Sequence, residues 1–458
     1  MIGYGSIGKG LLPLLEKHLA FAPDQLCIID PLTITKIATE LSQYQVVTEA
    51  VTQENCYALL KEHIKIGTTA LIINVAVDVD SATLIKTAQQ LNSLYIDTAT
   101  EAWPGFYIDD NLSLSERSNY MMRERVLALK ETCPQGMTAI SCCGANPGMV
   151  SWFVKKALLN LRDDINPSLS EPVTQKEWAV LMYELGVKGV HVAERDMQET
   201  SYIRPVGTFA NTWSVPGCIS ECIQAAELGW GTHEKKFPEN GNEHTTGNKA
   251  AIYLDSRGGE TVVKSWVPTG PQEAFLITHN EAISIADYFS LHDETNEALL
   301  FRPTVHYAYR PSKVTVDSIH ELMETGSSHT MLSRIITEDE ITGGSDYLGV
   351  LLYGHERNAY WFGSKLTIEE ARALAPRQNA TGLQVTSALI AAIVWAIDNQ
   401  EAGIIEADQL DYKQCLAVQA PYLGTLEGHY TDWSPGEGVA ASDRWQFYNV
   451  VVDKKTVS

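Results

Sequence analysis

The sequence predicts an α/β protein: a doubly wound parallel sheet, followed by a second, α+β domain with a largely antiparallel sheet. The chain opens on a glycine-rich turn. Apolar stretches of strand length then alternate with amphipathic stretches of helix length as far as residue 143. Such alternation indicates βαβ units. Beyond residue 143 short apolar stretches recur without this order, which favours antiparallel pairing.

The opening turn carries glycine at positions 3, 5 and 8, in the spacing G-x-G-x-x-G. Gly3 makes a tight turn, Gly5 lets backbone amides approach a pyrophosphate, and Gly8 lets helix pack on strand. A helix predicted over residues 6–18 would direct its N-terminus, with a partial positive charge, at the phosphates. The pattern favours a Rossmann-like, dinucleotide-binding domain. The alternative is a βαβ unit whose glycines are purely structural.

A second strand over residues 25–30 ends in Asp30, roughly 20 residues after the glycine turn, where a carboxylate binds the ribose hydroxyls and selects NAD over NADP. Only Met1 and Ile2 precede the turn. A strand usually has about five or six residues. We therefore expect either a clipped first strand or a start placed too late.

Composition limits the classes of function. A chain of 458 residues is expected to form more than one domain. We place boundaries at 1–146 for cofactor binding and 147–380 for substrate binding, with a C-terminal helix and tail, 381–458, packing back on the first domain. The net charge of −23 argues against a nucleic-acid partner. With no apolar run of membrane length and no signal sequence, we expect a cytoplasmic protein with reduced cysteines and no metal.

The elements follow from periodicity. In the first domain we predict further strands at 46–48, 69–75, 93–97 and 137–143, and helices at 52–66, 81–91 and 116–131. Later in the chain we predict helices at 151–160, 174–186, 219–228 and 381–399, and strands at 189–195, 211–216, 250–254, 275–279, 304–307 and 347–353.

In a doubly wound sheet, ligands bind at the carboxyl ends of the strands. The segments that follow the predicted strands are 77–78, 97–101 and 144–148, so Asp78, Glu101 and Asn146 are candidates to face the cofactor. The alternative for each polar residue, and for Thr98, is a helix cap or a turn.

The second domain offers Glu194, Trp213, Glu221 and His279 in apolar settings. A carboxylate in such a setting can hold an alkylammonium group or exchange protons. Tryptophan offers the best aromatic face for a cation, worth about 0.5–2 kcal/mol. Taken singly, the tryptophan could be core, the glutamate a helix-surface ion pair and the histidine a satisfied core residue.

Six stretches together resemble the bacterial homospermidine synthases: residues 3–8, 144–149, 191–196, 211–215, 228–234 and 279–287. The resemblance covers essentially the whole chain. It implies a Rossmann-like domain joined to a synthase-specific domain, a relationship to the saccharopine dehydrogenase group, and a homodimer.

The resemblance also implies a reaction. Putrescine gives up a hydride to a tightly held NAD and forms an imine that loses ammonia. A second putrescine adds, and the stored hydride reduces the Schiff base to homospermidine. Spermidine can replace the first putrescine and then releases diaminopropane. No net redox change occurs, so the enzyme is a transferase.

Residue roles follow from the same resemblance. Trp213 would stabilise the cationic imine, Glu221 and Glu194 would anchor ammonium groups or shuttle protons, and Asn146 and His279 would position the reacting amine. Asp78 and Glu101 would line the entrance. The cofactor-binding set would be Gly3, Gly5, Ser6, Ile7, Gly8, Asp30, Val77, Asp97, Thr98, Ala145 and Asn146.

Two other functions stay open at this point. A saccharopine dehydrogenase-like oxidoreductase acting on an amino acid would need Arg or Lys to bind the substrate carboxylate, whereas the candidates here are Glu, Trp, His and Asn. A non-catalytic NAD-sensing protein would need the glycine turn but not Trp213, Glu221 and His279.

Overall fold

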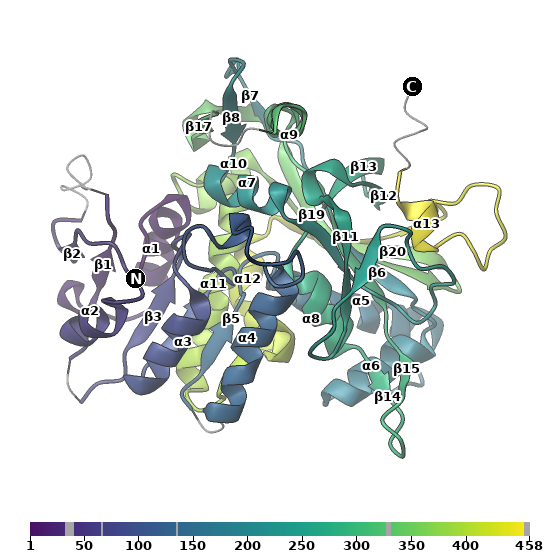
Figure 1. Ribbon diagram of the computed structural model, residues 1–458, viewed down its shortest axis with the longest axis horizontal. Helices are drawn as coiled ribbons and strands as arrows, with labels where there is room; N and C mark the ends of the chain where they lie inside the picture. The colour runs from purple at the N-terminus through teal and green to yellow at the C-terminus, as the bar shows by residue number, and fades with distance from the viewer. Residues whose placement is uncertain (33–40, 66, 134–135, 327–330, 453–458) are drawn as a thin grey trace. The chain divides into compact units, whose positions relative to one another are not determined.

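The computed structural model describes residues 1–32, 41–65, 67–133, 136–326 and 331–452. The chain divides into two compact units (Figure 1). The first unit comprises Met1–Met149 and Gly382–Tyr422, and the second comprises Val150–Thr381 and Leu423–Ser458. Both units are therefore built from two separate stretches of chain.

The first unit contains a parallel sheet. Its strands are β1 (Cys27–Ile29), β2 (Gln45–Val47), β3 (Leu71–Asn74), β4 (Leu94–Asp97), β5 (Ala139–Ser141) and β21 (Ile404–Glu406). Ile2 forms parallel bridges to both Ile29 and Asn74, so the order is β2-β1-Ile2-β3-β4-β5-β21. The Ile2 amide donates to the Ile73 carbonyl at 2.8 Å. A single residue thus occupies the position of the expected first strand, and the sheet is doubly wound as predicted.

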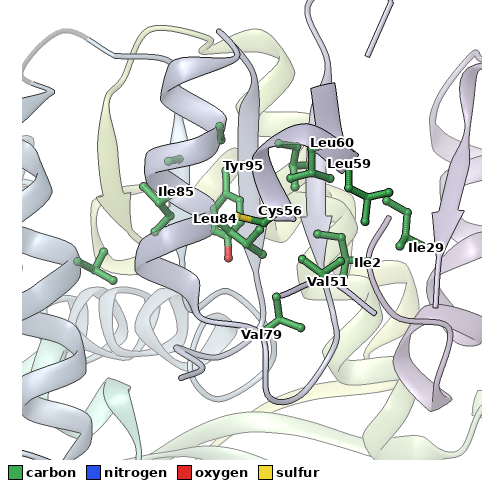
Figure 2. Packing of buried hydrophobic residues seen from close by; sticks show 14 of the residues in the cluster. Ile2, Ile29, Val51, Cys56, Leu59, Leu60, Val79, Leu84, Ile85 and Tyr95 are labelled. Atoms are coloured by element: carbon green, nitrogen blue, oxygen red, sulfur yellow. The ribbon is translucent and has the colours of Figure 1, made fainter. Parts of the chain in front are cut away.

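Helices pack on this sheet and close its core. They are α1 (Ser6–His18), α2 (Cys56–His63), α3 (Ser81–Gln90), α4 (Asn119–Thr132), α11 (Ala380–Asp398) and α12 (Tyr412–Gln419). The predicted end of the second helix, residue 66, lies outside the described residues. Ile2, Ile29 and Tyr95 pack with Leu59 of α2 and Leu84 of α3 (Figure 2). Helices α3 and α4 lie side by side in Figure 1.

Helix α11 is long and apolar enough to cross a bilayer by length and composition. However, 72% of its apolar window is buried inside the protein. It is the expected C-terminal apolar helix and serves as a core helix.

The second unit contains a ten-stranded sheet, in the order β10-β11-β9-β16-β6-β19-β20-β22, with β13 pairing both β16 and β12. Its strands are β6 (Gly189–Asp196), β9 (Ala225–Gly229), β10 (Gly241–Glu243), β11 (Ala251–Arg257), β12 (Val262–Val267), β13 (Gly270–Ile277), β16 (Thr304–Arg310), β19 (Ser345–His355), β20 (Asn358–Thr367) and β22 (Thr425–Thr431). Only the β16–β6 pair among these is parallel. The predicted fold class is confirmed.

Helices and short strand pairs complete the second unit. The helices are α5 (Met149–Ile165), α6 (Gln175–Glu184), α7 (Val215–Ile223), α8 (Asn280–Tyr288), α9 (Lys313–Thr325), α10 (Ile368–Leu374) and α13 (Phe447–Val450). The short pairs are β7 (Glu199–Thr200) with β18 (Ile341–Gly343), β8 (Thr208–Asn211) with β17 (Leu332–Ile335), and β14 (Leu291–His292) with β15 (Leu299–Phe301).

The strand expected at 211–216 and the helix expected at 219–228 are wrong in their bounds. Strand β8 ends at Asn211, and α7 begins at Val215 because the Ser214 side chain caps it by accepting the Gly217 amide. Residues 225–229 form strand β9 instead of the end of a helix. Trp213 therefore lies in the turn before a helix rather than in a strand.

The tail also differs from expectation. We expected residues 381–458 as a whole to pack on the first domain. Residues from Leu423 belong to the second unit, because β22 pairs with β20 and satisfies the backbone groups along that strand. Residues 453–458 lie outside the described part.

Glu194 and Tyr307 lie on one face of the paired strands β6 and β16. Two buried histidines lie together on the opposite face. The rings of His191 and His306 are 4.1 Å apart. Burial lowers the pKa of His306 from 6.5 to about 3, and burial together with the neighbouring His306 lowers the pKa of His191 well below its ordinary value. Both imidazoles are therefore neutral in the folded protein at neutral pH.

This burial predicts an acid-sensitive free energy of unfolding. His306 takes up a proton near pH 6.5 in the unfolded chain but only near pH 3 in the folded chain. The free energy of unfolding therefore has its full value above about pH 6.5 and falls as the pH drops towards 3, because over that range the unfolded chain binds a proton that the folded chain does not. By pH 4.5 the loss amounts to about 2–3 kcal/mol for His306. Denaturant titrations of His306→Gln at pH 7 and 4.5 should show a smaller acid loss than the parent. Equal losses would contradict the prediction.

Candidate active site

In the glycine turn of the first unit, two of the three glycines lie too close to other backbone atoms to carry a side chain. The third has open space where its side chain would be. Gly3 has φ +91°, and a Cβ there would lie 2.9 Å from the Ala76 amide nitrogen. A Cβ on Gly8 would lie 2.5 Å from the Gly3 carbonyl oxygen. A Cβ on Gly5 would meet no atom of the described residues within 4 Å. Gly5 is therefore the position where a bound group has room.

Helix α1 begins directly after this space, with Ser6 and Ile7 as its first residues. Its N-cap is Gly5, which has no side chain to satisfy the first amides of the helix. Uncapped amides at a helix N-terminus bind anions. The turn thus fits the pyrophosphate of a dinucleotide.

Asp30 lies just after β1 and is buried. Its Oδ2 accepts the Tyr4 amide at 2.7 Å, and its Oδ1 accepts the Leu32 amide at 2.9 Å. These bonds fix the carboxylate beside the turn. Each oxygen keeps lone-pair capacity for a sugar hydroxyl. The carboxylate would repel a 2′-phosphate, so the geometry fits NAD better than NADP.

Asp97 ties two strands together. Its Oδ2 accepts the Tyr95 hydroxyl at 2.7 Å, and its Oδ1 accepts the Cys142 amide at 2.6 Å. Burial raises its pKa to about 6. Both oxygens therefore accept hydrogen bonds from β4 and from the residue that follows β5, which is a structural role. The cofactor-binding role of Asp97 stays a prediction.

The other candidates of the first unit lie after strands, as predicted. Val77 is exposed, and Asp78, with φ 62°, donates its amide to Glu101 Oε2 at 3.3 Å. Burial raises the pKa of Asp78. Three more candidates follow strands β4 and β5: Thr98, Ala145 and Asn146, the last joined to Pro147 by a cis peptide bond.

In the second unit, Glu194 is buried on β6. Its Oε2 accepts the Tyr307 hydroxyl from the neighbouring strand β16 at 2.6 Å. Tyr307 stacks on Tyr309, with ring centroids 5.2 Å apart and planes at 15°. Tyr309 in turn accepts the indole Nε1–H of Trp213 at 3.0 Å. A continuous set of contacts therefore joins Glu194 to Trp213.

His279 lies between two carboxylates at the start of α8. Its Nε2 is 3.3 Å from Glu221 Oε1, and its Nδ1 is 3.2 Å from Glu281 Oε1. Its ring lies 4.5 Å from that of Tyr307. Burial lowers the pKa of His279, but the charges of Glu281 and Glu221 more than offset this, so its pKa lies well above the ordinary value. The imidazole is therefore cationic at neutral pH and can donate a proton.

Two more buried acids lie beside Glu194, one on the same strand and one on the neighbouring strand β19. Asp196 on β6 is aligned with Asp346 on β19, whose Oδ2 accepts the Thr381 hydroxyl at 2.7 Å. Burial raises the pKa of Asp196 to about 6. Burial, with the charges of Glu194 and Asp196, raises the pKa of Asp346 well above its ordinary value.

Two of these buried carboxyl groups have spare acceptors. In the part of the chain that the structure describes, Asp346 Oδ1 and Glu281 Oε2 have no hydrogen-bond partner. An unsatisfied buried acceptor costs about 1–3 kcal/mol, more if charged. An alkylammonium group has three donors with which to satisfy such oxygens. The site is therefore suited to a cation with N–H groups.

The structure thus brings together four predicted residues: Glu194, Trp213, Glu221 and His279. Sequence reasoning assigned no role to the residues that connect and surround them: Asp196, Glu281, Tyr307, Tyr309 and Asp346. One signal was available: Tyr307 ends the strand predicted at 304–307 and Tyr309 follows two residues later, so extending that strand to Arg310, where β16 ends, puts both rings on one face. No group of three or more described His, Cys, Asp or Glu side chains could hold a metal ion.

Comparison with known proteins identifies the family. The homospermidine synthase of Blastochloris viridis is 50% identical over 462 aligned residues, covering 99% of this chain and 96% of that protein. The chain belongs to the homospermidine synthase family. The homospermidine synthase of Mesorhizobium japonicum is 48% identical, covering 99% of this chain and 96% of that protein.

A solved structure and two domain families agree with this membership in the homospermidine synthases. The crystal structure of the Legionella pneumophila homospermidine synthase in complex with NAD matches with a TM-score of 0.90 and 38% identity, covering 99% of this chain and 97% of that one. The saccharopine dehydrogenase NADP binding domain matches residues 1–140, and the saccharopine dehydrogenase C-terminal domain matches residues 144–432.

The glycine geometry predicts which substitutions disturb the fold. Gly3→Ala places a Cβ against backbone at a positive φ and should lower the free energy of unfolding by about 2 kcal/mol or more. Gly5→Ala is the matched control, since its Cβ enters open space, and should cost less than about 1 kcal/mol. Denaturant titrations without added nucleotide test this. The prediction does not hold if both variants lose the same stability.

Proposed function

We propose that this chain is an NAD-dependent homospermidine synthase that transfers an aminobutyl group from putrescine or spermidine to putrescine. The observation that carries the proposal is the buried carboxyl cluster with spare acceptors around His279 and Trp213. An amino-acid dehydrogenase would place basic side chains against a substrate carboxylate, whereas the groups described at this cluster are carboxyl groups, phenols, an indole and an imidazole. The homodimer stays a prediction from the resemblance.

The first unit would hold the cofactor. Gly3, Gly5 and Gly8, with the amides of Ser6 and Ile7, would hold the pyrophosphate, and Asp30 the ribose. The strand-end residues Val77, Asp97, Thr98, Ala145 and Asn146 would line the rest of the site. When bound, NAD supplies a hydride acceptor that later returns the hydride within the same turnover. The NAD found in the Legionella relative, together with the position of Asp30, favours NAD over the NADP that the family description names.

The second unit would bind and deprotonate the substrate. A diamine carries two charges at neutral pH, because its amines have pKa values of roughly 10, like lysine. Glu194, Asp346 and Glu281 would hold distal ammonium groups. Arrival of an ammonium group favours the ionised form of Asp346, so substrate binding would release a proton there.

The reacting amine must be neutral before its carbon is oxidised. The group formed by Glu221, His279 and Glu281 would exchange that proton, since a carboxylate accepts it and the imidazolium can later return it to the leaving amine. Trp213 would present its indole face to the cationic imine. Asn146 would orient the amine, and Asp78 with Glu101 would attract cations at the entrance. Exclusion of water would keep the imine from hydrolysing.

The decisive assay incubates the purified protein with putrescine and catalytic NAD and measures polyamines, ammonia and NADH together. Homospermidine and ammonia without NADH accumulation are expected, because the hydride is returned in each turnover. If NADH rises in step with substrate loss, the protein is a conventional dehydrogenase and the proposal is wrong.

Trp213→Leu should lower kcat strongly while NAD stays bound, because the indole acts on the cationic intermediate. Loss of about 2 kcal/mol of cation–π stabilisation corresponds to about a thirtyfold lower rate. Turnover assays with calorimetric NAD titration measure both. Unchanged turnover would refute the role of Trp213.

Asp30→Ala should weaken NAD binding by about ten- to a hundredfold, through the loss of hydrogen bonds to a charged acceptor. It should also reduce discrimination against NADP. Calorimetric titration with both nucleotides measures this. An unchanged preference for NAD would show that another residue selects the cofactor.

A further inference from the structure

The indole of Trp213 is attached to an irregular part of the backbone. The residue lies between the end of β8 at Asn211 and the start of α7 at Val215, and its side chain is half-buried. Its Nε1–H donates to the hydroxyl of Tyr309 at 3.0 Å. This hydrogen bond links the ring to the large sheet.

Tyr309 is held more firmly than Trp213. It is buried on β16, aligned with Glu194 of β6 on one side and with Phe275 of β13 on the other. Its ring stacks on Tyr307, which donates its hydroxyl to Glu194. Burial and the charge of Glu194 raise the pKa of Tyr309 well above its ordinary value, so its hydroxyl stays neutral throughout the working pH range. The phenol oxygen is thus a fixed acceptor.

We infer that Tyr309 is a positioning residue whose hydroxyl holds the indole of Trp213 at the angle at which its ring face meets the cationic intermediate. This inference rests on the proposed role of Trp213. Cation–π attraction depends on the cation lying over the ring face, within about 6 Å of its centre. A freely tilting indole would present its face only part of the time. Tyr309 would therefore act on the rate through Trp213.

The test is a double-mutant cycle with Tyr309→Phe, Trp213→Phe and the double variant, measured by homospermidine formation. Tyr309→Phe should lower kcat by about five- to tenfold, the equivalent of one net hydrogen bond, with the KM for putrescine within about twofold of the parent, because the carboxyl anchors are intact. Added to Trp213→Phe, which has no N–H, it should cause no further loss. The pH profile should not shift.

Tyr360→Phe is the matched control. Tyr360 lies in the same unit on β20 and accepts the Asn160 side-chain amide at 2.9 Å, so this variant loses a similar hydrogen bond elsewhere. Its kcat should equal that of the parent. Thermal unfolding of every variant checks that the fold is kept. If Tyr309→Phe does not fold, Tyr309→Met, whose side chain adapts to irregular space, takes its place in the same cycle.

The outcomes separate this inference from the proposed function. The inference is overturned if Tyr309→Phe keeps the parental kcat, or if its effect is the same with and without the indole, while Trp213→Phe is impaired. If Trp213→Phe itself keeps full turnover, the role proposed for Trp213 is wrong and the inference fails with it. Homospermidine formation by the parent tests the proposed function separately.

Discussion

Backbone pairing of β6 with its two neighbours determines which side chains meet in the second unit. Parallel pairing with β16 aligns Glu194 with Tyr309, and antiparallel pairing with β19 aligns Asp196 with Asp346. Successive side chains in a strand point to opposite faces, so a slip of one residue would exchange the two faces of β6. Such a slip would put Arg195 on the face that Glu194 and Asp196 now share. The carboxyl cluster therefore depends on the register of this one strand.

The same pairing gathers carboxyl groups in a place where solvent cannot screen their charges when they ionise. Glu194, Asp196 and Asp346 are all buried, and Asp346 Oδ1 has no hydrogen-bond partner among the described residues. Burial of this kind lowers the stability of the free protein, and a bound polycation would restore it by supplying N–H donors and positive charge. The unit therefore combines a well-paired sheet with a group of acids that is better satisfied with ligand than without it.

Local chemistry determined what the sequence could predict. The glycine spacing, the helix Ser6–His18 and the acid at the end of β1 depend on neighbouring residues, and the structure has all three. In the second unit, residue type and resemblance pointed to Glu194, Trp213, Glu221 and His279. The contacts that join them were not predicted, because Tyr307 and Asp346 reach the site through strand pairings between distant parts of the chain. The turn at Trp213 was misplaced because the capping role of Ser214 was not recognised.

Each unit is built from two separate stretches of chain, and this has a consequence for biosynthesis. The first unit needs β21, which pairs with β5, and the second needs β22, which pairs with β20. Arg123 of α4 donates two hydrogen bonds, of 2.6 and 2.8 Å, to Glu406. These bonds cannot form until Glu406 has been synthesised. Residues up to Met149 therefore leave the ribosome with the edge of β5 unpaired, and that edge stays open while the second stretch is made. Both units can be completed only when almost the whole chain has been synthesised.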